Sequence, residues 1–324
     1  MNRVAIAGGG IIGGSIAWRL AQSGLRVDLF DAGIFGGEAS SAGAGMLSPG
    51  GEFDQPSVWL DIGIEGLRMY PAFVAELAEE SGIAIDFRIC GCAYYADPET
   101  AGRRAAFQSS AGIRVERTPD GLFFPEDGFV DPEGVLRALR GACQARGVNF
   151  HEHSPVASIE SSEYSALVIA AGAWSDQIAV RHRGAGLALP PSRPVKGHLV
   201  GFDLEPGALG AMRRRGHTYV LQRSNGFTIA GSTEEDCGFD RTVDAGICEQ
   251  IHGRVAAIFP RLGSAEVSKR WIGFRPFSED GPHIRRVEGT NVWLAYGHFR
   301  NGILLAPWTA QRIAAGIAGG SSSP

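Results

Sequence analysis

The glycine-rich segment near the N-terminus constrains the fold more than any other part of the chain. An apolar run, Val4–Ala7, leads into Gly8–Gly13, whose letters match G-x-G-x-x-G, and a helical pattern follows over Ile16–Ser23. In such a motif the first glycine permits a tight turn, the second lets a pyrophosphate approach the backbone, and the third lets helix and strand pack closely. Strand, glycine turn and helix in this order predict a dinucleotide-binding βαβ unit.

A second predicted strand, Arg26–Phe30, ends at Asp31, which lies 31 − 13 = 18 residues after the last glycine of the motif. A carboxylate at this position can accept hydrogen bonds from both hydroxyls of an adenosine ribose, and it disfavours a 2′-phosphate. These residues alone do not distinguish FAD from NAD.

Length and composition predict a soluble, enzyme-sized protein with two lobes. The chain has 324 residues, of which 44% are hydrophobic and 20% charged, so it can bury a large core. Its net charge of −5 provides no basic field for nucleic acid or an acidic membrane. The basic run Arg213–Arg215, which precedes Gly216, is expected to be a solvated turn.

The cysteines and histidines predict neither disulfides nor a metal site. Five scattered cysteines are an odd count, typical of a reducing compartment. Neither Cys90-Gly-Cys92 nor His151-Glu-His153 has the spacing of zinc ligands. The first strand begins at about Val4 and no apolar run approaches the ~18 residues of a membrane span, so we expect a cytoplasmic protein.

Seven segments between Gly8 and Pro307 carry a family resemblance: "GGGIIGGSIA", "SSAGAGML", "HEHSPVASIE", "VIAAGAWS", "RPVKGHL", "GFRPFSEDGP" and "GHFRNGILLAP". In content and order they resemble the D-amino-acid oxidase superfamily of flavoproteins, above all its glycine oxidases of thiamine biosynthesis. The resemblance implies FAD as the cofactor. It also implies non-covalent attachment, because no cysteine lies near the segments that would hold the flavin.

The resemblance implies cofactor contacts along most of the chain, from the pyrophosphate turn and the ribose carboxylate to the flavin. The expected cofactor-binding residues are Gly8, Gly10, Ile11, Ile12, Gly13, Asp31, Ala32, Ser40, Ser41, Ala44, Gly45, Met46, Val156, Ala171, Gly172, Trp174, Arg275, His298, Arg300, Asn301, Gly302 and Ile303.

The expected fold class is α/β, with a Rossmann-like FAD-binding domain interwoven with a substrate domain built on an antiparallel or mixed β-sheet. The alternating segments around a predicted hairpin turn at Ser224-Asn225-Gly226 favour the antiparallel part. The predicted FAD-binding domain is discontinuous, with residues 1–82, 130–185 and 271–324, and the predicted substrate domain has residues 83–129 and 186–270.

Arg275, in "WIGFRPFSEDG", is the predicted carboxylate-binding residue. A planar guanidinium donates two parallel hydrogen bonds to a carboxylate, and the family's arginine in this segment holds the substrate carboxylate. Gly273 and Pro276 predict that it lies on an irregular loop. The alternative is a structural arginine at a domain boundary.

Arg300 precedes a predicted helix that starts near Asn301-Gly302-Ile303. The positive end of that helix and the guanidinium could together favour the anionic, reduced flavin. The alternative is a structural ion pair with an acid such as Asp280.

Tyr219 and His217 complete the predicted catalytic set, which is Arg275, Tyr219, Arg300 and His217. On one strand they would share a face, so the tyrosine could lie over the substrate and donate to its carboxylate. The alternative is that both side chains belong to a half-buried strand without a catalytic role.

Together these features predict FAD-dependent oxidative deamination of glycine or another small amino acid or amine, with hydride transfer to flavin N5. Oxygen would give peroxide, and the imine would yield glyoxylate and ammonia or a thiazole precursor. Neither nucleic acid nor membrane is an expected partner, and a homo-oligomer is left open. The alternatives are a D-amino-acid or sarcosine dehydrogenase with another electron acceptor, a tRNA-modifying flavin enzyme, and a non-catalytic flavin-binding module.

Overall fold

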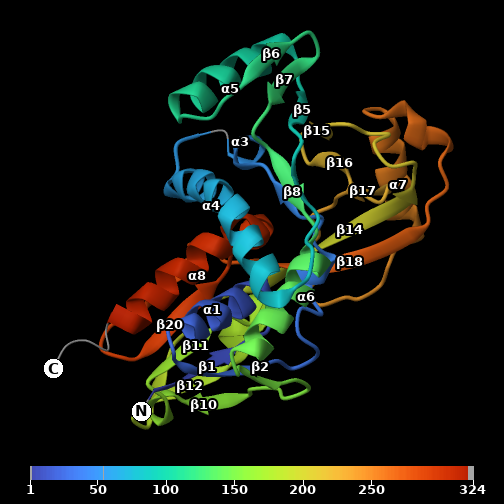
Figure 1. Cartoon of the computed structure of the whole chain (residues 1–324). Coiled ribbons are helices and arrows are strands. Elements are labelled where there is room, and N and C mark those ends of the chain that lie inside the picture. The colour runs from blue at the N-terminus through green and yellow to red at the C-terminus, as the bar shows by residue number, and fades with distance from the viewer. Residues whose placement is uncertain (1, 54, 320–324) are drawn as a thin grey trace.

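A largely parallel sheet forms the base of the molecule in the computed structural model, which describes residues 2–53 and 55–319 (Figure 1). Its six strands in this described part have the order β19-β20-β11-β1-β2-β9, and β19 alone runs antiparallel to its neighbour. The strands are β1 (Arg3–Ala7), β2 (Arg26–Phe30), β9 (Asn149–His151), β11 (Ala166–Ile169), β19 (His283–Arg286) and β20 (Val292–Tyr296).

Both faces of this sheet are covered, which explains why its central strands are apolar throughout. In β1, Val4 and Ile6 face a helical layer, whereas Ala5 and Ala7 face a small second sheet. The helical layer is α1 (Ile11–Gln22), α4 (Val58–Ser81), α6 (Pro132–Ala145) and α8 (Gly302–Gly319). The small sheet is β10 (Ser158–Glu160), β12 (Ala179–His182) and β13 (Ala185–Leu187).

A larger sheet forms the second lobe. In the described part of the chain it has eight strands, in the order β18-β14-β17-β16-β15-β5-β7-β6, and every neighbouring pair is antiparallel except β15 and β5. The strands are β5 (Cys92–Tyr95), β6 (Glu116–Thr118), β7 (Gly121–Phe124), β14 (Arg193–Asp203), β15 (Met212–Arg215), β16 (Thr218–Gln222), β17 (Phe227–Gly231) and β18 (Lys269–Phe277). Helix α7 (Ala245–Ala256) packs on one face, and α5 (Pro98–Ser110) packs near β7.

Short elements join the two lobes. A three-stranded sheet contains β3 (Met46–Leu47), β8 (Gly128–Val130) and β4 (Phe87–Ile89). The one-turn helices α2 (Ala39–Ala42) and α3 (Pro49–Glu52) flank β3 along the chain. Four 3₁₀ turns complete the described elements: η1 (Ser161–Glu163), η2 (Gly172–Gln177), η3 (Pro260–Ser264) and η4 (Phe299–Asn301).

The predicted α/β fold with an antiparallel second sheet is confirmed, and β2 and β20 have the predicted bounds. The hairpin between β16 and β17 turns at residues 223–226, where Gly226 has φ +96°. The division into two domains stays a prediction, and its boundary at residue 271 falls inside β18, which pairs with β14. Within the described residues, no helix is both long and apolar enough to cross a membrane.

Two local predictions are wrong. Arg275 was expected on an irregular loop, but it lies on β18, paired with Val195 of β14, because Gly273 and Pro276 are accommodated within the strand. Arg213–Arg215 was expected to be a solvated turn, but these residues belong to β15, between β16 and β5 in the sheet.

Candidate active site

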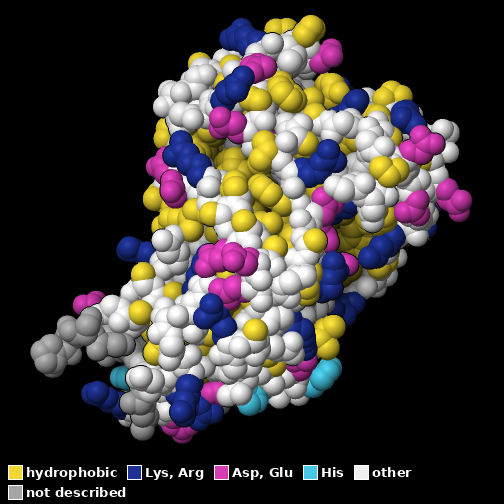
Figure 2. Space-filling model, viewed as in Figure 1, with side chains coloured by type: hydrophobic (Ala, Val, Ile, Leu, Met, Phe, Trp, Pro, Cys, Tyr) yellow, Lys and Arg dark blue, Asp and Glu magenta, His cyan; other side chains and the backbone are white. Residues whose placement is uncertain are grey.

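A cavity of about 730 Å³ extends from the carboxyl ends of β1 and β2 to the face of the eight-stranded sheet. It is lined by segments of both lobes that lie far apart in the sequence, including Gly8, Asp31, Trp174, Arg275 and Arg300. On the face drawn in Figure 2, hydrophobic side chains gather where α4 approaches the eight-stranded sheet. A cavity that is long, mostly apolar and dotted with polar groups is typical of a cofactor site.

The glycine turn between β1 and α1 leaves room for an anion at the helix start. Gly8 has φ +112°, and a β-carbon there would lie 2.3 Å from the carbonyl oxygen of Ala170. A β-carbon at Gly13 would lie 1.9 Å from the carbonyl oxygen of Gly8, so the helix packs on the turn itself. Gly10 is the N-cap of α1 and carries no capping side chain. The Ile11 N–H donates to the Ser40 hydroxyl at 2.9 Å, so the other N–H groups of the first turn are the ones available to a phosphate.

Asp31 lies at the end of β2, beside the glycine turn, and lines the cavity. Its two carboxylate oxygens each accept a backbone N–H at 2.8 Å, one from Gly9 and one from Gly33. These bonds fix the carboxylate while each oxygen keeps a further lone pair, so the geometry suits acceptance of ribose hydroxyls.

Most of the predicted cofactor-binding residues line this one cavity. The lining includes Gly8, Gly10, Ile11, Ile12, Asp31, Ala32, Ser40, Ala44, Gly45, Met46, Val156, Ala171, Gly172, Trp174, Arg275, His298, Arg300, Asn301, Gly302 and Ile303. Gly13 and Ser41 are not among the lining residues, because Gly13 packs behind the turn and the Ser41 hydroxyl donates to the carbonyl oxygen of Glu38. No cysteine occurs among the described residues of the lining.

Arg275 presents a cation to the cavity that no described carboxylate pairs with. Its Nη1 donates to the carbonyl oxygen of Thr233 at 2.9 Å and its Nη2 donates to the Ser232 hydroxyl at 2.8 Å. The guanidinium lies over Gly197 of β14, where a β-carbon would be 2.4 Å from Nη1. Burial lowers the pKa of Arg275, and the nearby carboxylates of Glu234 and Glu52, neither of which forms an ion pair with it, offset this only in part. An anionic ligand would supply the remaining compensation.

Tyr219 lies beside this cation. It pairs across the sheet with Gly231, whose missing side chain leaves room for the phenol: a β-carbon there would lie 2.9 Å from the hydroxyl. Burial raises the pKa of Tyr219, so the phenol keeps its proton and can donate a hydrogen bond into the cavity.

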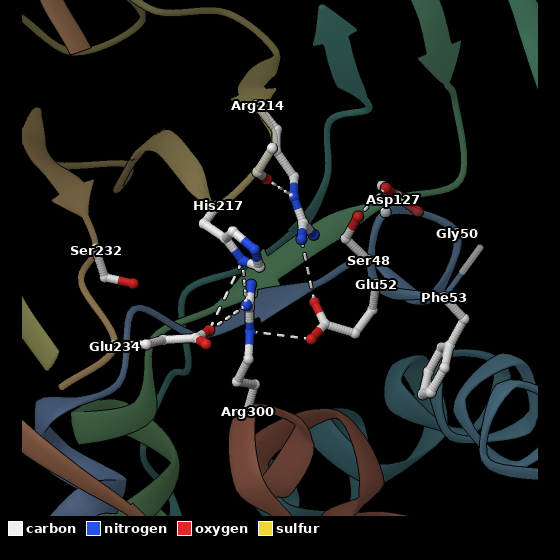
Figure 3. Close-up of polar contacts among 12 residues, drawn as sticks. Ser48, Gly50, Glu52, Phe53, Asp127, Arg214, His217, Ser232, Glu234 and Arg300 are labelled. Atoms are coloured by element: carbon white, nitrogen blue, oxygen red, sulfur yellow. Dashed lines mark hydrogen bonds and ion pairs between the residues drawn. The ribbon is translucent and has the colours of Figure 1, made fainter. Parts of the chain in front are cut away.

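Arg300 is held by two carboxylates, as Figure 3 shows. Its Nε lies 2.9 Å from Glu52 Oε1, and its Nη1 lies 2.5 Å from Glu234 Oε1. Nη1 also donates to Nδ1 of His217 at 2.7 Å. The weighed alternative of a structural ion pair is therefore present, but its partners are Glu52 and Glu234 rather than Asp280.

His217 differs from its predicted position. It lies in the turn before β16, not on the strand with Tyr219, and its side chain is 73% exposed. It does not line the cavity and touches the site through Arg300. The strand begins one residue later, so the two side chains do not share a strand face.

Arg214 is a site residue that the sequence did not reveal. Alternation along β15 places its side chain opposite those of Arg213 and Arg215, so it lines the cavity and is only 5% exposed. Its Nε donates to the carbonyl oxygen of Gly216 at 2.8 Å, and its Nη2 lies 3.2 Å from Glu52 Oε2. The carboxylate of Glu52 therefore bridges Arg214 and Arg300 (Figure 3).

The segment that carries Glu52 is fixed from behind. The Ser48 hydroxyl donates to Asp127, and burial raises the pKa of the Asp127 carboxyl to about 7. From α5, Gln108 Nε2 donates to the carbonyl oxygens of Gly50 at 2.8 Å and Phe53 at 2.6 Å. Helix α3 and its glutamate are thus anchored on both sides.

His298 lies at the start of the C-terminal helix and lines the cavity. Burial lowers its pKa to about 3, and its Nε2 lies 3.1 Å from the Thr309 hydroxyl. The imidazole is therefore neutral at physiological pH, which suits a packed polar contact rather than a cationic acid.

Sequence patterns did not indicate four residues that contact or line the site, which are Glu52, Glu234, Arg214 and Arg241. Arg241 also lines the cavity, and its Nη2 lies 2.8 Å from Glu38 Oε1 across the cofactor end. The alternating pattern of β15 was the one available signal, since a strand with one buried face would bury Arg214 but not its neighbours.

The parallel sheet, the glycine turn and the long cavity define a dinucleotide-binding oxidoreductase whose cavity also takes in Arg275 and Tyr219 of the second sheet. The side-chain-free glycine turn and the Asp31 carboxylate lie in one cavity of about 730 Å³, so the residues fit the pyrophosphate and ribose of FAD.

Comparison with known proteins agrees. A model of the FAD dependent oxidoreductase family matches residues 3–315, and the chain belongs to this family. It is 31% identical to glycine oxidase from Bacillus licheniformis, over 97% of this chain and 92% of the relative. It superposes on the crystal structure of glycine oxidase from Geobacillus kaustophilus with a TM-score of 0.89 and 30% identity, covering 97% and 94% of the two chains. The protein is an FAD-dependent amino-acid or amine oxidase.

Proposed function

We propose that the protein oxidises glycine or another small amino acid or amine, with oxygen as the electron acceptor. The products would be hydrogen peroxide and an imine, which hydrolyses to glyoxylate and ammonia or serves thiazole assembly for thiamine. The observation that carries the proposal is the pairing of Arg275, a cation without a described acid partner, with the protonated phenol of Tyr219 in one cavity. The similarity to glycine oxidases supports the choice of substrate.

The residues have separable roles in this proposal. Arg275 and Tyr219 bind the substrate carboxylate and thereby orient the Cα–H bond. The glycine turn and Asp31 hold the two halves of the dinucleotide, and the start of α8, with Arg300 beside it, faces the flavin end. When bound, FAD supplies the hydride acceptor.

The protein's setting belongs to the same proposal. A cytoplasmic location, as the free cysteines suggest, would keep the enzyme beside its amino-acid pool. No nucleic acid and no membrane take part in it.

Anaerobic spectral titration tests the proposal. Glycine, sarcosine or D-alanine should bleach the oxidised flavin of the holoprotein, and readmitted air should restore its colour with formation of about one peroxide per flavin. Bleaching that air fails to reverse would replace the oxidase by a dehydrogenase with another acceptor. A flavin that none of these amines bleaches would contradict the proposed substrate class.

A further inference from the structure

The substrate end of the cavity has a nearly closed charge balance. Among the described residues near Tyr219, the cations are Arg214, Arg275 and Arg300, and two of the three are paired. Glu52 bridges Arg214 and Arg300, and Glu234 adds a second carboxylate to Arg300. Arg275 has no carboxylate partner among these residues, so one substrate carboxylate neutralises the remaining positive charge.

Glu52 is placed to interact with any further charge on a ligand. Its side chain is 16% exposed and lines the cavity. Both it and Glu234 lie close enough to Arg275 to influence the charge on that guanidinium. Because α3 is anchored through Ser48 and Gln108, the carboxylate cannot easily withdraw from a ligand bound at Arg275.

We propose that Glu52, supported by Glu234, is a specificity-determining residue that restricts this oxidase to amines with a single carboxylate. This inference rests on the proposed function and adds a residue that rejects substrates. A second anionic group would lie near Glu52 with both neighbouring arginines already engaged. Like charges about 5 Å apart in a partly buried site lower affinity on the order of 100-fold.

The charge of Asp127 acts in the same direction. It lies behind Ser48 and interacts electrostatically with Arg214, so its ionised form would further reduce the attraction of that arginine for a ligand. No described cation at this end is left over for a second carboxylate once Arg275 is occupied.

A matched pair of substrates tests the proposal. Sarcosine and iminodiacetate share the secondary amine and one carboxylate, and iminodiacetate carries a second carboxylate on its N-methyl carbon. In the wild-type holoprotein, sarcosine should reduce the flavin with the higher kcat/KM. In Glu52→Gln, the ratio of kcat/KM for iminodiacetate to that for sarcosine should rise at least about tenfold.

A surface glutamate provides the control. Glu65→Gln removes the same charge from α4, where the side chain is 54% exposed and pairs with Arg68. Its iminodiacetate-to-sarcosine ratio should equal that of the wild type. Two results would overturn the proposal. One is a wild type that prefers iminodiacetate, because the second carboxylate then displaces Glu52 from the two arginines. The other is an iminodiacetate-to-sarcosine ratio in Glu52→Gln that is no higher than in the control.

Ligand binding separates this proposal from the proposed function. Acetate and malonate, titrated into the oxidised holoprotein, should each shift the flavin absorbance. Acetate should bind more tightly than malonate, and Arg275→Ala should bind both more weakly than the wild type does. Glu52→Gln should reduce the ratio of the malonate and acetate dissociation constants by at least about tenfold. Glu234→Gln should reduce it less, because the Glu234 side chain is 36% exposed. If no amine bleaches the flavin but acetate and malonate bind in this order, the proposed oxidation is wrong while the selectivity for one carboxylate stands. If the difference between acetate and malonate binding is the same in all variants, Glu52 does not determine this selectivity.

Discussion

The two ends of the cavity achieve binding by different means. At the cofactor end, Gly8, Gly10 and Gly13 carry no side chains, which keeps the backbone of the turn accessible to a ligand, and Asp31 is the main charge. At the substrate end, three arginines and two glutamates from five segments neutralise one another except at Arg275. Shape therefore controls the first end and charge balance the second, so the two should respond differently to the same kind of substitution.

The largest effect is expected where shape controls. In Gly13→Ala the new β-carbon would lie 1.9 Å from the carbonyl oxygen of Gly8, a contact between two rigid parts of the backbone. We expect a protein that does not retain FAD and is destabilised by roughly 3 kcal/mol or more. Flavin content after gel filtration measures this. Gly253→Ala, whose β-carbon would meet nothing within 4 Å, is the control, and a yellow Gly13→Ala protein would contradict the reasoning.

Removing the unpaired cation should separate the two ends. Arg275→Ala should keep its flavin but lose about 10³-fold in kcat/KM for carboxylate substrates, because a buried charge-assisted pair is lost. Stopped-flow reduction of the holoprotein measures the loss. Turnover at a near-native KM would show that another residue binds the carboxylate.

Asp127 tests whether buried charge limits stability at the substrate end. Its carboxyl ionises near pH 3.8 in the unfolded chain and near 7 in the folded one, so between these values the folded state holds a proton that the unfolded state has lost. The free energy of unfolding therefore falls as pH rises through this window, by roughly 3 kcal/mol between pH 5 and pH 8.

Asp127→Asn should remove that slope. Urea unfolding at saturating FAD, at pH 5 and at pH 8, gives the comparison between variant and wild type. Parallel pH profiles for the two proteins would mean that Asp127 does not titrate in this range.

Gly197 should show that the charged end also depends on shape. A β-carbon at this position would lie 2.4 Å from Nη1 of Arg275, and the guanidinium is the flexible end of a side chain, so it moves and the fold survives. Gly197→Ala should bind FAD normally and lose about 10- to 100-fold in kcat/KM, because small displacements of a positioning group are costly. Gly186→Ala, with open space around it, should behave as wild type. An unchanged KM would mean that the guanidinium has room elsewhere.

The smallest effect is expected where an exposed ion pair spans the cofactor end. Arg241 and Glu38 have side chains 60% and 45% exposed, so their pair is partly screened by solvent. Arg241→Gln should speed FAD release about threefold, as followed by the fluorescence of free FAD after dilution. High salt should screen the ion pair and bring the FAD release rate of the wild type closer to that of the variant. Release rates that differ by tenfold or more would show that Arg241 contacts the cofactor directly.

Residues that act with their sequence neighbours were predictable. The βαβ start, Asp31, the hairpin at residues 224–226 and the strand Val292–Tyr296 all follow from contiguous patterns, and the structure contains each of them. The family resemblance added Arg275, Tyr219 and Arg300, all of which line the cavity. His217 was misplaced by one strand boundary, an error to which propensity reasoning is prone.

The sequence by itself determined the cofactor end, because a turn between a strand and the next helix is built from residues that are adjacent in the chain. Only the tertiary structure decided the substrate end. Glu52, Arg214, Glu234 and Arg300 come from four separate segments, and their ion pairs depend on strand register and on where α3 is anchored. No local pattern records which charges meet, since that is set by the packing of the two lobes.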